Sequence, residues 1–219
     1  MAHWEHRKEN SWKKFRFNQP YEKGAKRLRE EVIGKTDFDP AVLWQWGTMQ
    51  AMAVIRILKD CECEFGEKGQ QVVNNALRKV GYDIGKQLFK GLNKPEDLSE
   101  AEIISFFATV VNRIVYASLE DPRIDSGDRV SFDITWCPHQ DHYTAFDCRV
   151  QRYLVQGMLD AFYETDWIGH NWQLKFTCTI PAGASVCTFV FWRASEEEQA
   201  EWELYTKKLE ARALNESRK

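Results

Sequence analysis

The spacing of apolar residues along the chain first changes its period near residue 128. Upstream of this point, apolar residues recur every three or four positions, which is the period of an amphipathic helix. Asp39-Pro40 and Asp97-Leu98-Ser99 supply helix start signals, and Asp121-Pro122 supplies a stop. We therefore predict a layer of three helices, over residues 40–59, 66–91 and 99–120.

Downstream, the apolar residues alternate with polar ones, as a half-buried strand requires. Residues 130–137 alternate in this way, and so do 172–180 and 186–192, which flank a turn at 181–184 and should form a hairpin. Helical spacing returns over residues 146–161. We expect Gly183, in the turn, to tolerate substitution less well than Gly157, in that helix.

These elements predict an α+β fold, with an N-terminal helical layer packed on a small antiparallel sheet. Residues 1–36 are polar and lack periodicity, so we interpret them as an irregular or partly helical lead-in that the fold can lose. Residues 37–194 form a single domain. Ser195, followed by three glutamates, starts a C-terminal helix over residues 195–219.

Composition narrows the class of protein. The chain has 219 residues, 43% of them hydrophobic, which is enough for a sizeable core. Its net charge of −3 creates no field that would attract nucleic acid. The charged N-terminus lacks the apolar run of a signal peptide, and no stretch is apolar enough to span a membrane. We expect a cytoplasmic protein whose six cysteines are not paired in disulfides.

Candidate chemistry is concentrated after the first strand. The segment from Cys137 to His142 holds a thiol, two imidazoles (His139 and His142) and a carboxylate within six residues. Pro138 restrains Cys137 to an extended backbone, so the strand sets the position of the sulfur. Functional groups are common in such loops at strand ends.

Two more cysteines join this set of candidates. Asp147-Cys148 opens the following helix, where the helix dipole is expected to lower the pKa of a thiol, and Cys187 lies in the second hairpin strand. Cys178 shares a face with apolar residues and is interpreted as a small buried side chain. The pair Cys61 and Cys63 lacks a matching second pair and receives no role.

Three of these segments resemble the L-2-amino-thiazoline-4-carboxylic acid hydrolase family. They are Cys137-Pro138, the helix that carries Asp147-Cys148 and ends near Gly157-Met158-Leu159, and the strand segment Ala182 to Phe189. Ala184 stands where the family pattern has an aspartate, which leaves the substrate open. The resemblance implies a fold similar to vinyl-reductase-type small-molecule-binding domains. It also implies opening of a C–N bond in a small cyclic amidine or amide.

Two hydrolase mechanisms and one binding function are compatible with these residues. In a hydrolase, a Cys137 or Cys148 thiolate attacks the ring carbon, and His139 or His142 transfers the proton. Alternatively Cys137, Cys148 and Cys187, with a histidine or Asp147, hold zinc. In the third, the chain binds a small molecule without turnover, and any metal is structural. The expected partners are a small heterocyclic substrate and, at most, a second copy of the chain in a homodimer.

Overall fold

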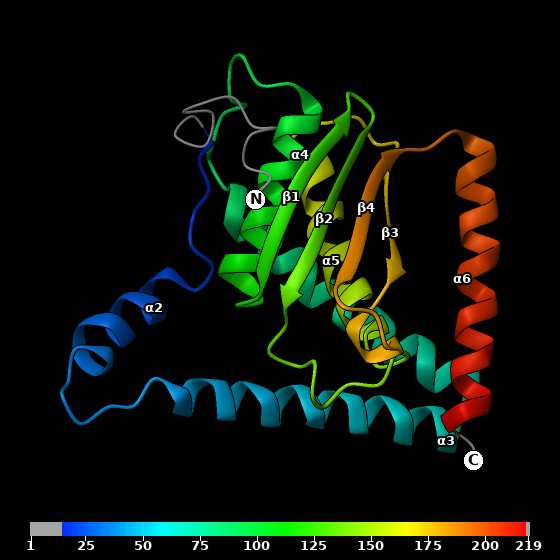
Figure 1. Ribbon diagram of the computed structural model, residues 1–219, viewed down its shortest axis with the longest axis horizontal. Helices are drawn as coiled ribbons and strands as arrows, with labels where there is room; N and C mark the ends of the chain where they lie inside the picture. Colours follow the sequence, from blue (N-terminus) through cyan, green and yellow to red (C-terminus); the bar gives the residue numbers. More distant parts are fainter. Residues whose placement is uncertain (1–14, 218–219) are drawn as a thin grey trace.

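Helices cover one face of a four-stranded antiparallel sheet in the computed structural model, which describes residues 15–217 (Figure 1). The strands are β1 (Leu119–Ser126), β2 (Arg129–Trp136), β3 (Trp172–Cys178) and β4 (Cys187–Arg193), in the order β1-β2-β4-β3. The helices are α2 (Glu22–Leu28), α3 (Ala41–Phe89), α4 (Glu100–Thr109), α5 (Arg149–Tyr163) and α6 (Glu196–Ser217). The predicted α+β class is confirmed.

Several predicted elements are confirmed in detail. β3 and β4 pair antiparallel around a short 3-10 turn, Ile180–Ala182, and β2 pairs with β4 on the other side. Ser99 caps α4 through its side chain, as the start signal predicts. Ser195 and Glu198 exchange hydrogen bonds at the start of α6, which forms a capping box.

Two predicted boundaries are wrong. The first two predicted helices are confirmed as the two parts of α3, which meet at the non-helical Gly66 (φ 60°, ψ −139°), but the first part continues beyond residue 59. Strand β1 replaces the predicted C-terminal end of the third helix, which ends in π-helical turns at Val110–Val115. Asp121-Pro122 therefore lies within a strand. A proline is tolerated there because β1 is the edge of the sheet.

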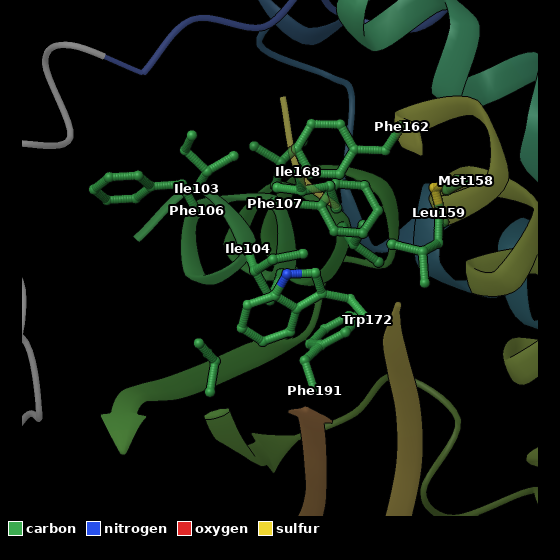
Figure 2. Close-up of a cluster of buried hydrophobic side chains, with 14 of the residues drawn as sticks. Ile103, Ile104, Phe106, Phe107, Met158, Leu159, Phe162, Ile168, Trp172 and Phe191 are labelled. Atoms are coloured by element: carbon green, nitrogen blue, oxygen red, sulfur yellow. The ribbon is translucent and has the colours of Figure 1, made fainter. Parts of the chain in front are cut away.

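The main core lies between the sheet and the helices α4 and α5. Figure 2 shows α4 contributing Ile103, Ile104 and Phe107, which face Phe162 of α5, and Trp172 and Phe191 of the sheet. The rings of Phe107 and Phe162 stack with their centres 4.8 Å apart. This packing fixes the position of α5 relative to the sheet.

Glycines allow α3 and α5 to approach at backbone distance. A Cβ atom added at Gly157 of α5 would lie 1.9 Å from the carbonyl oxygen of Arg78, and one added at Gly81 would lie 1.9 Å from that of Leu154. Gly183, in the hairpin turn, has a positive φ of 92° but open space around it. The expectation that Gly183 tolerates substitution less well than Gly157 is therefore unsupported, because it did not include the contact between α3 and α5.

The lead-in contributes to the core. Residues 1–14 lie outside the described part of the chain, but Phe15 is buried, with 4% of its surface exposed, and packs against Phe106 and Trp167. The backbone N–H of Asn18 donates to the carbonyl of Leu88. Within residues 15–217, no helix has the length and apolar character needed to cross a membrane.

Candidate functional site

A small cavity opens where β2 ends and α5 begins. The inner cavity, of about 60 Å³, lies between α5, the strands β2, β3 and β4, and the turns after α4. It is lined by Asn112, Tyr116, Ser118, Ile134, Cys137, Pro138, His139, Tyr143, Cys148, Gln151, Val155, Phe176, Thr179, Cys187 and Phe189. The structure thus brings together four of the predicted site residues, namely three cysteines and one histidine.

The three thiols of the inner cavity are protonated at neutral pH. Burial raises the pKa of Cys148 to about 12, with a further contribution from Cys187. Burial also raises the pKa of Cys137, although the backbone N–H groups of His139 and Gln140 donate to its sulfur and act in the opposite direction. The pKa of Cys187 is raised by burial as well. The expected lowering at Cys148 is wrong, because loss of solvent outweighs the helix dipole.

His139 supplies a neutral imidazole to the same cavity. Burial lowers its pKa, and the neighbouring His142 lowers it further. Its ring stacks on Tyr143, with the ring centres 4.8 Å apart, so its orientation is fixed by packing. A neutral imidazole can donate one hydrogen bond and accept another.

Three buried polar atoms at this cavity have no hydrogen-bond partner within residues 15–217. They are the side-chain nitrogen of Asn112, the hydroxyl of Tyr116 and Nδ1 of His139. Burial raises the pKa of Tyr116 well above its ordinary value, so its hydroxyl keeps its proton and can donate. Unpartnered buried polar groups are costly, and in native proteins they call for an explanation.

Two of the predicted site residues lie outside the inner cavity. His142 lies against Trp44 of α3, with the ring centres 6.0 Å apart. The carboxylate of Asp147 forms an ion pair of 2.8 Å with Lys59 and accepts a hydrogen bond from the backbone N–H of Thr144. Asp147 therefore connects the loop before α5 to α3. Its position next to Cys148 in the sequence gave no indication of this structural role.

The predicted zinc ligands do not form a metal site. Across residues 15–217, no group of three or more histidine, cysteine, aspartate or glutamate side chains is arranged to hold a metal ion. All six thiols are free. The donor set does not fit zinc, and we derive no chemical step through it.

A larger pocket adjoins the inner cavity. The outer pocket, of about 290 Å³, lies between α5, α6 and the end of β3. It is lined by Ala145, Phe146, Cys148, Arg149, Arg152, Tyr153, Phe176, Thr177, Cys178, Thr179, Ala182, Trp202, Tyr205, Leu209 and Glu210. Cys148, Phe176 and Thr179 line both spaces, so the two adjoin at these side chains.

Cys178 lies in this outer pocket and is exposed, contrary to the prediction that it is buried. The pairing of β3 with β4 shifts register between Phe176 and Cys178, so the strict alternation of faces is lost there. Sequence analysis also missed Asn112, Tyr116 and Arg152. Each sits in an otherwise ordinary helical segment, and only the fold places it against the cysteines.

Comparisons with known proteins identify one close relative. No family model matches the chain. A solved structure of a trafficking protein particle complex subunit 3 from Naegleria fowleri, covalently bound to palmitic acid, superposes with a TM-score of 0.47 at 13% identity, over 71% of this chain and 97% of that one. That likeness is too distant to bear on what this chain binds.

An uncharacterized protein of Archaeoglobus fulgidus is 58% identical over 219 residues, which cover 98% of this chain and 96% of the relative. Such identity over nearly the full length of both chains establishes common descent. The chain belongs to the same family as this archaeal protein.

Proposed function

We propose that the chain binds a small, largely apolar organic molecule in the inner cavity and the outer pocket. The observation that carries the proposal is the set of three unpartnered polar atoms, on Asn112, Tyr116 and His139, in an otherwise apolar cavity. Ligand pockets combine such apolar walls with a few convergent polar groups. The six free thiols support the cytoplasm as the place of action.

The inner cavity favours an uncharged hydrogen-bond acceptor. Asn112 and Tyr116 offer donors, and neither lysine nor arginine lines this space. An ionised group would lose its hydration there without gaining a counter-ion. A carbonyl oxygen at the end of an apolar chain satisfies these requirements.

Octanamide, which joins a carbonyl to an apolar tail, is a suitable first probe for isothermal titration calorimetry. Asn112→Leu removes one donor of the inner cavity, and we expect it to weaken binding by about 2- to 10-fold, the contribution of a single hydrogen bond. Stability should change little, because the amide nitrogen has no partner in the protein to lose. The melting temperature measured alongside separates weakened binding from loss of the fold.

A second pair of variants tests whether octanamide binds in the inner cavity. Val155→Phe fills the inner cavity, whereas Val80→Phe makes the same change on α3, where Val80 is 46% exposed. We expect the first variant to lose octanamide binding and the second to bind like the parent. Equal binding by both would contradict the assignment of the site.

Hydrolysis of a C–N bond is the second candidate function. The observation that favours it is that Cys137 and His139 line the same cavity, as a nucleophile and its base must. The raised thiol pKa weighs against it, because the attacking species is the thiolate. We therefore place binding first and hydrolysis second.

A further inference from the structure

Arg152 of α5 has an unusual environment in the wall of the outer pocket. Its guanidinium carbon lies 4.9 Å from the ring centre of Trp202, and one of its N–H groups donates to the hydroxyl of Thr206. A guanidinium carries five N–H donors in a planar fork. Most of this donor capacity is therefore open to a further partner.

No acidic side chain within residues 15–217 forms an ion pair with Arg152. The neighbouring Arg149 shows the contrast, because it forms a 2.6 Å ion pair with the buried Glu62. Glu210 also lines the outer pocket, but its carboxylate accepts a hydrogen bond from Tyr153. Of the two arginines in this pocket, only Arg149 is neutralised by a contact within the fold.

A half-buried cation without a counter-ion is unfavourable. Burial lowers the pKa of Arg152, and the nearby Tyr153 and Glu210 only partly offset this effect. The guanidinium nevertheless stays protonated, since no protein environment removes its proton at neutral pH. An anion placed against its free edge would supply the missing charge and hydrogen bonds.

The walls around Arg152 define the rest of the ligand. Phe146, Phe176, Trp202 and Tyr205 make the pocket largely aromatic. Through Phe176, it adjoins the inner cavity, where only uncharged groups are expected. A molecule that spans both spaces thus carries its charge at the outer end and its apolar body toward the inner cavity.

We propose that Arg152 binds the carboxylate of an organic acid whose apolar chain extends past Cys148 and Phe176 and ends in an uncharged acceptor within the inner cavity. The proposal rests on the binding function proposed above and specifies the ligand class. Trp202 would hold the guanidinium plane from one face and leave its edge for the two carboxylate oxygens.

8-Amino-8-oxooctanoate and octanamide, compared by calorimetry at one pH near neutrality, test the proposal. They share the amide and the chain, and a carboxylate in the first replaces the terminal methyl of the second, so their ratio of affinities isolates the contribution of the anion. We expect the parent to bind 8-amino-8-oxooctanoate at least about tenfold more tightly than octanamide, as a charged hydrogen-bonded pair provides. Arg152→Met should abolish this preference while retaining octanamide binding.

Arg212→Met is the matched control. Arg212 also lies on an aromatic ring, 5.0 Å from the centre of Phe146, but is exposed and does not line the outer pocket. This variant should keep the preference for 8-amino-8-oxooctanoate. Arg152 is half-buried and forms no ion pair, so Arg152→Met should leave the melting temperature unchanged or raised.

The failures are distinguishable. If the parent binds octanamide but shows no preference for 8-amino-8-oxooctanoate, or if Arg152→Met keeps the preference, the carboxylate assignment is wrong and the binding function stands. If the melting temperature of Arg152→Met falls and the parent shows no preference between the two compounds, the role of Arg152 is to balance the charge of Glu210 instead. If the parent binds neither compound, the proposed function fails with it.

Discussion

Burial sets the protonation of the cysteines around the inner cavity. Cys148 is the N-cap of α5, a position where a thiolate gains from the helix dipole, yet its pKa is raised to about 12. The helix dipole stabilises a thiolate only modestly, whereas burial removes the hydration that stabilises the charged form. The thiols therefore act as weakly polar walls of the cavity.

This account predicts the order in which the thiols react. With iodoacetamide near pH 7.5, the exposed Cys63 and Cys178 should be alkylated first, and Cys137, Cys148 and Cys187 much more slowly. A raised pKa leaves less thiolate at a given pH, so the alkylation of these three thiols should become appreciable only as the pH increases. Peptide mapping by mass spectrometry at successive times measures the order.

A different order would change the function assigned. If Cys137 or Cys148 reacts fastest at neutral pH, one of them has an accessible thiolate, and hydrolysis becomes the better candidate. Addition of 8-amino-8-oxooctanoate provides a control. A ligand in the two pockets should slow the alkylation of Cys148 and leave the alkylation of Cys63 unaffected.

The sequence identified four residues of the inner cavity that carry chemistry and missed two. Cysteine, histidine and proline at a strand end are conspicuous, and Cys137, His139, Cys148 and Cys187 do meet. Asn112 and Tyr116 gave no such signal, because they are brought to the cavity by the π-helical turns after α4. A polar residue at a helix end is common, and only its tertiary surroundings show that it lacks a partner.

The contact between α3 and α5 determines how closely α3 packs against the helix that lines the inner cavity. The two helices touch at backbone distance through Gly81 and Gly157, which no side chain larger than hydrogen would permit. Inner-cavity residues Gln151 and Val155 lie on α5 just before this contact. Displacement of α5 would therefore alter the site as well as the core.

We expect Gly157→Ala to destabilise the protein more than Gly183→Ala. The added methyl at residue 157 would meet the carbonyl of Arg78, and the resulting overpacking costs about 1–3 kcal/mol or more. At residue 183 the methyl has free space, and only its positive φ adds a cost of roughly 1–2 kcal/mol. Chemical denaturation of both variants measures the difference. The reverse order would show that α3 and α5 separate without strain.

Sequence periodicity predicted the hairpin, α4, α5 and α6 well, because each has its own alternation or caps. It failed for β1, since Asp121-Pro122 is a helix stop in most contexts and is accepted here only at a sheet edge. It placed the break between two helices correctly at Gly66, although it ended the first of them too early. The failure at β1 concerns a feature that depends on what lies beside the segment.

At the scale of the whole molecule, the N-terminal segment is tied to the core. Phe15 inserts between Phe106 and Trp167 although its neighbours in sequence are polar. The periodicity of the lead-in could not indicate this, because a few closely spaced residues carry the contact and they follow no helix or strand period. Removal of residues 1–36 would expose the apolar surface that Phe15 covers.

We predict that Phe15→Ala lowers the free energy of unfolding by about 3–5 kcal/mol, as expected for a buried phenylalanine. Phe65→Ala, the same change at a side chain that is 68% exposed, should cost less than about 0.5 kcal/mol. Urea denaturation of both proteins gives the comparison. Equal stabilities would mean that the lead-in is dispensable after all.

One ligand is proposed to occupy the outer pocket and the inner cavity together. A crystal structure of the protein with 8-amino-8-oxooctanoate tests this arrangement, because the two ends of the ligand are chemically distinct. We predict the carboxylate on Arg152 and the amide oxygen against the side chains of Asn112 and Tyr116, within the inner cavity. Ligand density elsewhere on the protein, or in neither space at saturating ligand, would contradict the proposal.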